Sequence, residues 1–154
     1  MNMLVLCCLF PLSLLAGQQD LEMLLKELDA VIECKDFYIL PKEKELSELR
    51  LRLKNTKNNR QKYELCDKLF TAYLHYQADS ALSYVERKQE LLPFLDEPVL
   101  EQELIINRAE VMGVMGMYSW AEQLLSQVKP GILTPELLGY YYRTMRANYG
   151  WFAD

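Results

Sequence analysis

The residues of this chain that could do chemistry are few and lie apart in the sequence. The single histidine, His75, has no serine or cysteine motif to accompany it, and a lone histidine is usually a surface or half-buried residue. Carboxylates such as Glu43, Glu45 and Glu48 alternate with Lys and Arg at helical spacing, which is typical of a solvated face. No phosphate-binding glycine loop, nucleophile elbow or HExxH motif is present. The sequence therefore predicts a protein that is not an enzyme, with no catalytic residues and no cofactor.

The four cysteines give no metal motif. Cys7 and Cys8 lie in an apolar N-terminal segment, whereas Cys34 and Cys66 lie on separate expected helices. A disulfide between the latter two requires Cα atoms within about 7 Å, which the sequence does not determine. Two buried free thiols are the alternative that we favour. Because no CxxC or Cys/His spacing occurs, we predict no metal site.

The N-terminal segment is unlike the rest of the chain. Met1–Gly17 contains no charged residue, is rich in Leu, Val, Cys and Phe, and ends in small residues. Such a segment is typical of a secretory signal peptide and is short for a membrane span. A buried first helix or an uncleaved anchor is the alternative. We expect residues 1–17 to be a signal peptide, and the protein to be exported to the periplasm or the extracytoplasmic face of the inner membrane.

After this leader the chain is predicted to be all-α. Residues 21–32 have the three-and-four apolar spacing of a one-faced helix, with Asp20 as N-cap. Pro41 breaks or starts a helix, and residues 42–54 follow as a Lys/Glu-rich helix. We expect residues 18–59 to form an N-terminal antiparallel helical hairpin. The narrow apolar stripe of its second helix consists of Leu46, Leu49 and Leu53.

Five further helices are expected from residue 60 onward. Asp79 or Ser80 is the expected cap of the second of these, and the fourth is expected over Ser119–Val128. The last helix has Thr134 as its cap and a proline in its first turn, and we expect it to end at Gly150. No segment has the alternating pattern of a β-strand.

One stretch has the pattern of a helical-hairpin repeat. Residues 109–121 combine a helix carrying a small residue, a glycine-marked reversal, and a second helix that opens on another small residue. Small residues let two helix backbones approach closely, and glycine readily takes the left-handed conformation at a helix end. Gly116 and Gly150 are 34 residues apart, which is the period of tetratricopeptide repeats.

These positions resemble the tetratricopeptide (TPR) family. The consensus small, glycine, aromatic, small and large positions are matched by Ala109, Gly116, Tyr118, Ala121 and Leu125. The resemblance implies antiparallel helical hairpins stacked as a short TPR-like solenoid over residues 60–154, with an incomplete third repeat.

The order of features along nearly the whole chain is similar to the N-terminal half of membrane-tethered TPR regulators of Bacteroides-type bacteria. In those proteins a membrane span, a coiled coil and a cytoplasmic regulatory segment follow the repeats. Because this chain stops at Asp154 within the expected third repeat, we expect it to be a truncated form or fragment of such a regulator.

Tyrosines are the better indication of a binding surface, because they combine rigid contact area with a polar tip. Packing between helices is the alternative for most of them. Three consecutive residues cannot share one side of a helix, so at least one of tyrosines 140–142 should face solvent or a partner. In the repeat register, the concave face would suit a peptide or a small polymer end. The candidate partner-binding residues are Tyr73, Glu103, Ile106, Glu110 and Tyr141.

Charge and composition limit the possible partners. The chain is 51% hydrophobic and 25% charged, with a net charge of -5, so it lacks the basic surface that nucleic acid requires. We expect a protein or peptide partner, and membrane contact only through the leader or a missing downstream span. Two functions remain open: the extracytoplasmic sensor part of a membrane-tethered transcriptional regulator, or a free-standing secreted or periplasmic adaptor that scaffolds other proteins. A hydrophobic span encoded downstream would favour the first.

Overall fold

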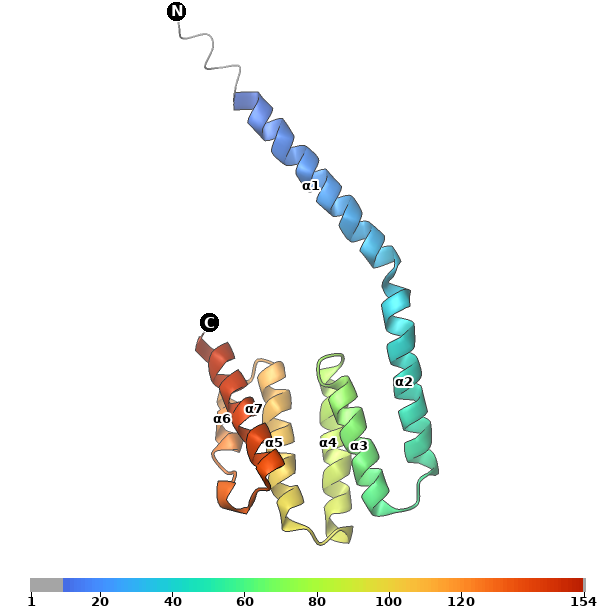
Figure 1. Cartoon of the computed structure of the whole chain (residues 1–154), viewed down its shortest axis with the longest axis vertical. Helices are drawn as coiled ribbons and strands as arrows, with labels where there is room; N and C mark the ends of the chain where they lie inside the picture. The colour runs from blue at the N-terminus through green and yellow to red at the C-terminus, as the bar shows by residue number, and fades with distance from the viewer. Residues whose placement is uncertain (1–9, 154) are drawn as a thin grey trace, which may run out of the picture. The chain divides into compact units, whose positions relative to one another are not determined.

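The structure, a computed structural model, describes the backbone of residues 10–153 and the side chains of residues 21–37 and 39–150. Within the described backbone every regular element is helical, which confirms the all-α prediction (Figure 1). The helices are α1 (Phe10–Glu33), α2 (Lys35–Asn55), α3 (Asn59–Tyr73), α4 (Ala78–Leu91), α5 (Pro98–Val114), α6 (Tyr118–Leu125) and α7 (Pro135–Ala153). Short 3-10 turns, η1 (Leu92–Phe94) and η2 (Pro130–Ile132), precede α5 and α7.

The chain divides into two compact units, Met1–Glu45 and Leu46–Asp154. In the first unit, every described residue from 21 to 37 is exposed. The large apolar side chains described in α1, from Leu21 to Ile32, are accordingly 49–61% exposed. None of the helices in the described part of the chain is both long and apolar enough to span a membrane. Of the predicted leader, residues 1–9 lie outside the described residues, and the backbone of residues 10–17 belongs to α1.

The first unit corrects three expectations. Asp20 lies inside α1 and is not an N-cap. Pro41 lies inside α2, where strong helix formers follow it, and does not break the helix. The break lies at Cys34, which alone separates α1 from α2. Two helices that fold back on each other need a connection of roughly 2–5 residues. The antiparallel hairpin expected over residues 18–59 is therefore absent.

The second unit consists of stacked antiparallel hairpins, as expected. Helix α3 packs on α4 and α5 packs on α6, while α4 contacts α5 and α7 contacts both α5 and α6. These helices lie side by side in Figure 1. Because each hairpin reverses the chain, α3, α5 and α7 all run in the same direction. Asn58 begins the stack, since its side chain accepts a hydrogen bond from the Gln61 amide (3.0 Å) and caps α3.

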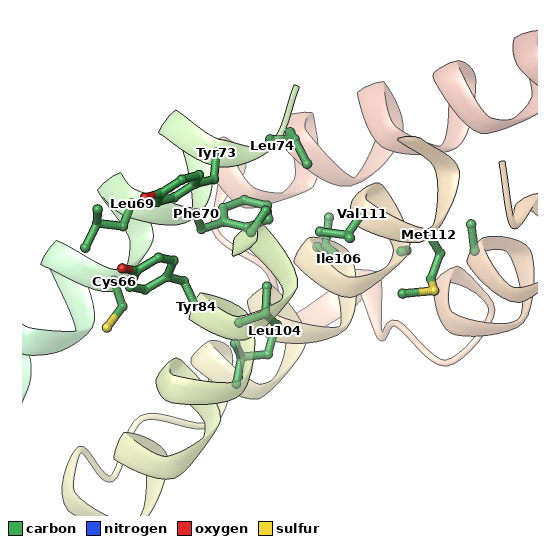
Figure 2. Close-up of a cluster of buried hydrophobic side chains, with 14 of the residues drawn as sticks. Cys66, Leu69, Phe70, Tyr73, Leu74, Tyr84, Leu104, Ile106, Val111 and Met112 are labelled. Atoms are coloured by element: carbon green, nitrogen blue, oxygen red, sulfur yellow. The ribbon is translucent and has the colours of Figure 1, made fainter. Parts of the chain in front are cut away.

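One hydrophobic core runs through this stack. Figure 2 shows Phe70 and Tyr73 of α3 with Tyr84 of α4, and Ile106 of α5 further along the cluster. The apolar stripe predicted for α2 also joins it: Leu46 is fully buried, and Leu49 and Leu53 pack against the cluster. The predicted small residues Ala109 and Ala121 are buried, and so is Ala81 of α4.

The predicted reversal at Gly116 is confirmed. Gly116 has φ +77°, and no other described glycine has a positive φ. Its amide donates to the carbonyl of Gly113 (3.0 Å), and the Met117 amide donates to the carbonyl of Met112 (2.8 Å). This pair of bonds is a Schellman motif, which satisfies carbonyls left open where α5 ends.

Other helix ends differ in detail from the sequence prediction. Thr134 caps α7 as expected, because its hydroxyl accepts from the Leu137 amide (3.3 Å). Asp79 and Ser80 lie inside the first turn of α4, and α6 ends at Leu125. Gly150 does not end α7, since it lacks the positive φ of a terminating glycine and the helix continues to Ala153.

Candidate functional site: a groove lined by α3, α5 and α7

A groove of about 860 Å³ opens on one side of the second unit. Helix α5 contributes Glu103, Asn107 and Glu110, which share one face because they are three to four residues apart. Residues of α3 and α7 form the two sides, and the segments before α5 and α7 close one end. The apolar part of the lining comprises Phe70, Leu74, Val99, Leu100, Leu137 and Ala147.

A buried lysine forms hydrogen bonds with three residues that line the groove. Lys88 of α4 is fully buried, and its ammonium donates to Asp67 Oδ1 (2.5 Å), Glu103 Oε1 (2.5 Å) and Asn107 Oδ1 (2.7 Å). It also lies 4.6 Å from the centre of the Tyr63 ring, within cation–π range. Two carboxylates and an amide oxygen therefore compensate the desolvation of one charge. These contacts join α3, α4 and α5.

Tyr140 extends this network to α7. Its hydroxyl accepts a hydrogen bond from Asn107 Nδ2 (3.0 Å) and donates one to the Glu110 carboxylate. Burial raises the pKa of the Tyr140 phenol, and the neighbouring Glu110 adds to this effect. Burial also raises the pKa of Glu110, against the hydrogen bond from Tyr140. The groove floor is thus a continuous polar network that spans four helices.

Basic side chains line one end of the groove, and two of them, His75 and Arg143, lower the pKa of the Glu110 carboxyl against the effect of burial. His75 follows α3, and Arg143 and Arg146 lie on α7; all three are exposed. Among the described residues, none of the three lies within 4 Å of a carboxylate oxygen. Arg60, at the other end of the groove, differs because it pairs with Glu97 (2.5 Å).

The structure places the five predicted partner-binding residues in two groups. Glu103 and Glu110 line the groove. Tyr73, Ile106 and Tyr141 do not line it, and they are buried at 4%, 0% and 8% exposure. These three belong to the hydrophobic core, because they face the neighbouring helices. Their burial corrects the prediction that these three residues contact a partner directly.

Single residues show what the sequence analysis predicted and what it missed. Tyr142 is the outward tyrosine that was expected of residues 140–142, with 56% exposure. Lys88 was missed, although the sequence held a signal: it continues the buried stripe of Ala81, Tyr84 and Val85 at helical spacing. A charged residue on an apolar stripe needs buried partners, and here Asn107 is one of them.

The two described cysteines differ in burial. Cys66 is buried in the core, where desolvation raises the pKa of its thiol, and Cys34 is exposed. Both thiols are free, so the expectation of two buried thiols holds for Cys66 and is wrong for Cys34. The described residues contain no cluster of His, Cys, Asp and Glu side chains that could hold a metal ion.

A comparison with known families accounts for this arrangement. The family described as the SusR N-terminal TPR domain matches residues 32–154, which is most of the chain. The protein belongs to this family. No significant match was found among curated proteins or among solved structures. TPR domains are protein-interaction modules, and stacked repeats present extended concave surfaces for binding. The groove lined by α3, α5 and α7 lies on this stack.

Proposed function

We propose that this SusR-type TPR domain is the extracytoplasmic sensor part of a membrane-tethered transcriptional regulator, and that the groove is the surface through which it senses a partner. The groove carries the proposal: three helices of the stack each turn one face toward it, and their polar side chains are linked to one another. An interaction module needs a surface of this kind.

Two properties suit the groove to binding. Its volume of about 860 Å³ lies within the range of roughly 300–1,000 Å³ that is usual for binding pockets. Lys88 and Tyr140 fix Glu103, Asn107 and Glu110 before any partner arrives. A surface that is already ordered loses less conformational entropy on binding, which favours affinity.

The regulatory and exported parts of the proposal have separate support. The family match is to the N-terminal domain of a regulator type. The uncharged apolar segment Met1–Gly17 has the composition of an export signal. Together these support a groove on the extracytoplasmic side, where it would receive a signal that a cytoplasmic segment of the regulator reads out.

Chromosomal alleles test the regulatory role. Thr71→Trp places a large ring in the groove from an exposed position on α3, and Gln123→Trp makes a matched change on an exposed face of α6 outside it. We expect the Thr71→Trp strain to change the same set of transcripts as deletion of the gene, and the Gln123→Trp strain to match wild type. Wild-type transcripts in the deletion strain would overturn the regulatory role. Wild-type transcripts in the Thr71→Trp strain alone would overturn the role of the groove.

Export is tested independently. Alkaline phosphatase folds to an active form only where its disulfides can form, so its fusion to Asp154 reports the compartment. We expect activity from the fusion to the full chain and none from a fusion that lacks residues 1–17. Equal activity from both, or none from either, would contradict the assignment of residues 1–17 as an export signal.

A further inference from the structure

Helix α1 carries an apolar face that is exposed to solvent, and acidic side chains lie along both of its edges. We propose that this face binds in an apolar groove of a partner protein, and that the rim of that groove carries Lys and Arg side chains. The inference goes beyond the function proposed above and does not depend on the groove lined by α3, α5 and α7.

The first argument is the continuity of the apolar face. Six large apolar side chains of α1 fall within an arc of about 120° at 3.6 residues per turn, and they are 49–61% exposed. They are Leu21, Leu24, Leu25, Leu28, Val31 and Ile32. The first four have the i, i+3, i+4 and i+7 spacing with which an amphipathic helix enters an apolar groove. A contiguous exposed apolar face of this kind marks an interaction site.

The second argument is that the TPR domain does not account for this face. The family match begins at residue 32, so five of the six apolar positions precede it. The helices of the TPR stack bury their apolar faces against one another in one core, whereas every described residue of α1 is exposed. The face of α1 therefore needs an explanation other than the packing of repeats.

The third argument is charge, which specifies the partner. Glu27 lies about 40° beyond one edge of the apolar face, and Asp29 lies about 40° beyond the other. Residues 21–33 hold four acidic side chains and one basic side chain, Lys26, which gives a net charge of -3; the acidic ones are Glu22, Glu27, Asp29 and Glu33. An interface commonly has an apolar centre and a polar rim, and a rim of Lys and Arg attracts these acidic edges.

The same charges disfavour two other occupants. A second copy of α1 would place acidic edges against acidic edges in either orientation, which is repulsive. The face also spans only residues 21–32, which is fewer than two heptads, whereas a coiled coil needs about three to four. Helices that lie on a membrane surface carry Lys and Arg beside the apolar face, because the lipid surface is anionic, and α1 has the opposite sign. A partner protein with a basic rim fits both the apolar face and its edges.

Photo-crosslinking of the full chain in cells of the native host tests which molecule covers this face. The photoreactive residue p-benzoylphenylalanine replaces Leu25 in the test chain. In the control chain it replaces Met23, which is 56% exposed on the opposite side of α1. We expect irradiation to join the test chain to one other protein, identified by mass spectrometry, and to give no such product with the control chain.

Isothermal titration calorimetry with that purified protein then tests the apolar contact. We expect Leu24→Glu/Leu28→Glu to raise the Kd at least tenfold. The matched control is Met23→Glu/Ala30→Glu, which adds the same charge to exposed positions on the opposite side of the helix, and it should leave the Kd within about twofold of wild type. Because all four positions are exposed, both variants should keep the melting temperature of wild type.

The basic rim is tested by reversing charge. At low ionic strength, we expect Glu27→Lys/Asp29→Lys to raise the Kd at least tenfold. The control Glu86→Lys/Glu90→Lys changes the net charge equally at exposed positions of α4 and should leave the Kd within about twofold of wild type. Equal Kd values for the edge variant and wild type would overturn the basic rim, and equal losses in test and control variants would overturn the docking face.

Other occupants of the face would also overturn the proposal. A crosslink to a second copy, a crosslink within one chain, or no crosslink at all would each do so. Cosedimentation with vesicles of phosphatidylglycerol and phosphatidylethanolamine that Leu24→Glu/Leu28→Glu abolishes would assign the face to a lipid surface instead. These outcomes are separable from those of the proposed function. Changed transcripts in the Thr71→Trp strain without a crosslink at residue 25 refute this inference alone, and the crosslink with wild-type transcripts in that strain refutes the role of the groove alone.

Discussion

Replacing Lys88 by methionine is the sharpest test of the polar network beneath the groove. Methionine keeps an unbranched apolar side chain but removes the ammonium that three acceptors share and that lies over the Tyr63 ring. The pair with Asp67, whose side chain is 44% exposed, contributes about 0.5 kcal/mol because water screens it. The pair with Glu103, which is 22% exposed, contributes about 1.5 kcal/mol, and the buried Asn107 oxygen left without its donor costs about 1 kcal/mol. We expect Lys88→Met to lower the free energy of unfolding by about 3 kcal/mol.

Urea and thermal unfolding measure this loss, and a domain of this size should melt about 12 °C lower. Lys68→Met, an exposed lysine on α3, is the control and should change the free energy of unfolding by less than about 0.5 kcal/mol. If the loss arises from stranded carboxylates, Lys88→Met should cost about 1.5 kcal/mol less in a Glu103→Gln background. A loss below about 1 kcal/mol, or strictly additive effects of the two substitutions, would refute the reasoning.

Three further predictions concern stability. Gly116→Ala should cost about 1 kcal/mol, because its φ of +77° disfavours a side chain although no atom lies within 4 Å of the new Cβ, while Gly139→Ala inside α7 should stabilise by up to about 1 kcal/mol. Leu46→Ala should cost about 3 kcal/mol and Leu51→Ala, at a 60% exposed site, less than about 0.5 kcal/mol. The folded-state pKa of Glu110 lies above its ordinary 4.5, so the contribution of its protonated carboxyl is complete below about pH 4.5 and is lost as the pH rises through the raised value. In urea titrations, the free energy of unfolding of wild type relative to Glu110→Gln should therefore be largest below about pH 4.5 and fall as the pH rises above it.

Each of these three predictions has a result that would contradict it. Equal effects of the two glycine substitutions would mean that backbone conformation does not distinguish the sites. If Leu46→Ala left the free energy of unfolding unchanged, α2 would not be part of the packed unit. A pH-independent difference between wild type and Glu110→Gln would mean that the folded chain does not favour the protonated carboxyl.

Much of the stacked unit could be predicted from the sequence, because its determinants are local. Gly116 marks its turn through the backbone freedom of glycine, and Thr134 marks a helix start through its hydroxyl. The small residues Ala109 and Ala121 indicate where helices approach closely. Each of these residues determines the conformation of only the few residues around it. Contacts with distant parts of the chain therefore do not change its effect.

The rest depends on contacts between distant residues. A lysine is normally found at the surface. Lys88 is buried only because Asp67, Glu103 and Asn107 from two other helices surround it. Ile106 lies one residue from Asn107 on α5 but faces the core, so a small error in helix register reverses the role of a residue. Pro41 was expected to interrupt a helix, yet the helix formers that follow it continue α2.

The position of Lys88 has a consequence for how the unit unfolds. Stacked repeats usually behave as chains of near-independent neighbours that fray from their ends. Here one ammonium is shared by three helices and is linked through Asn107 to Tyr140 of α7, so separating any one of them strands a charge or a buried polar atom. Cooperativity is thereby built into a short array. The hydrogen-bonded amides in the middle of α3, α4 and α5 should exchange hydrogen through a single global opening, with no intermediate that retains half of the stack.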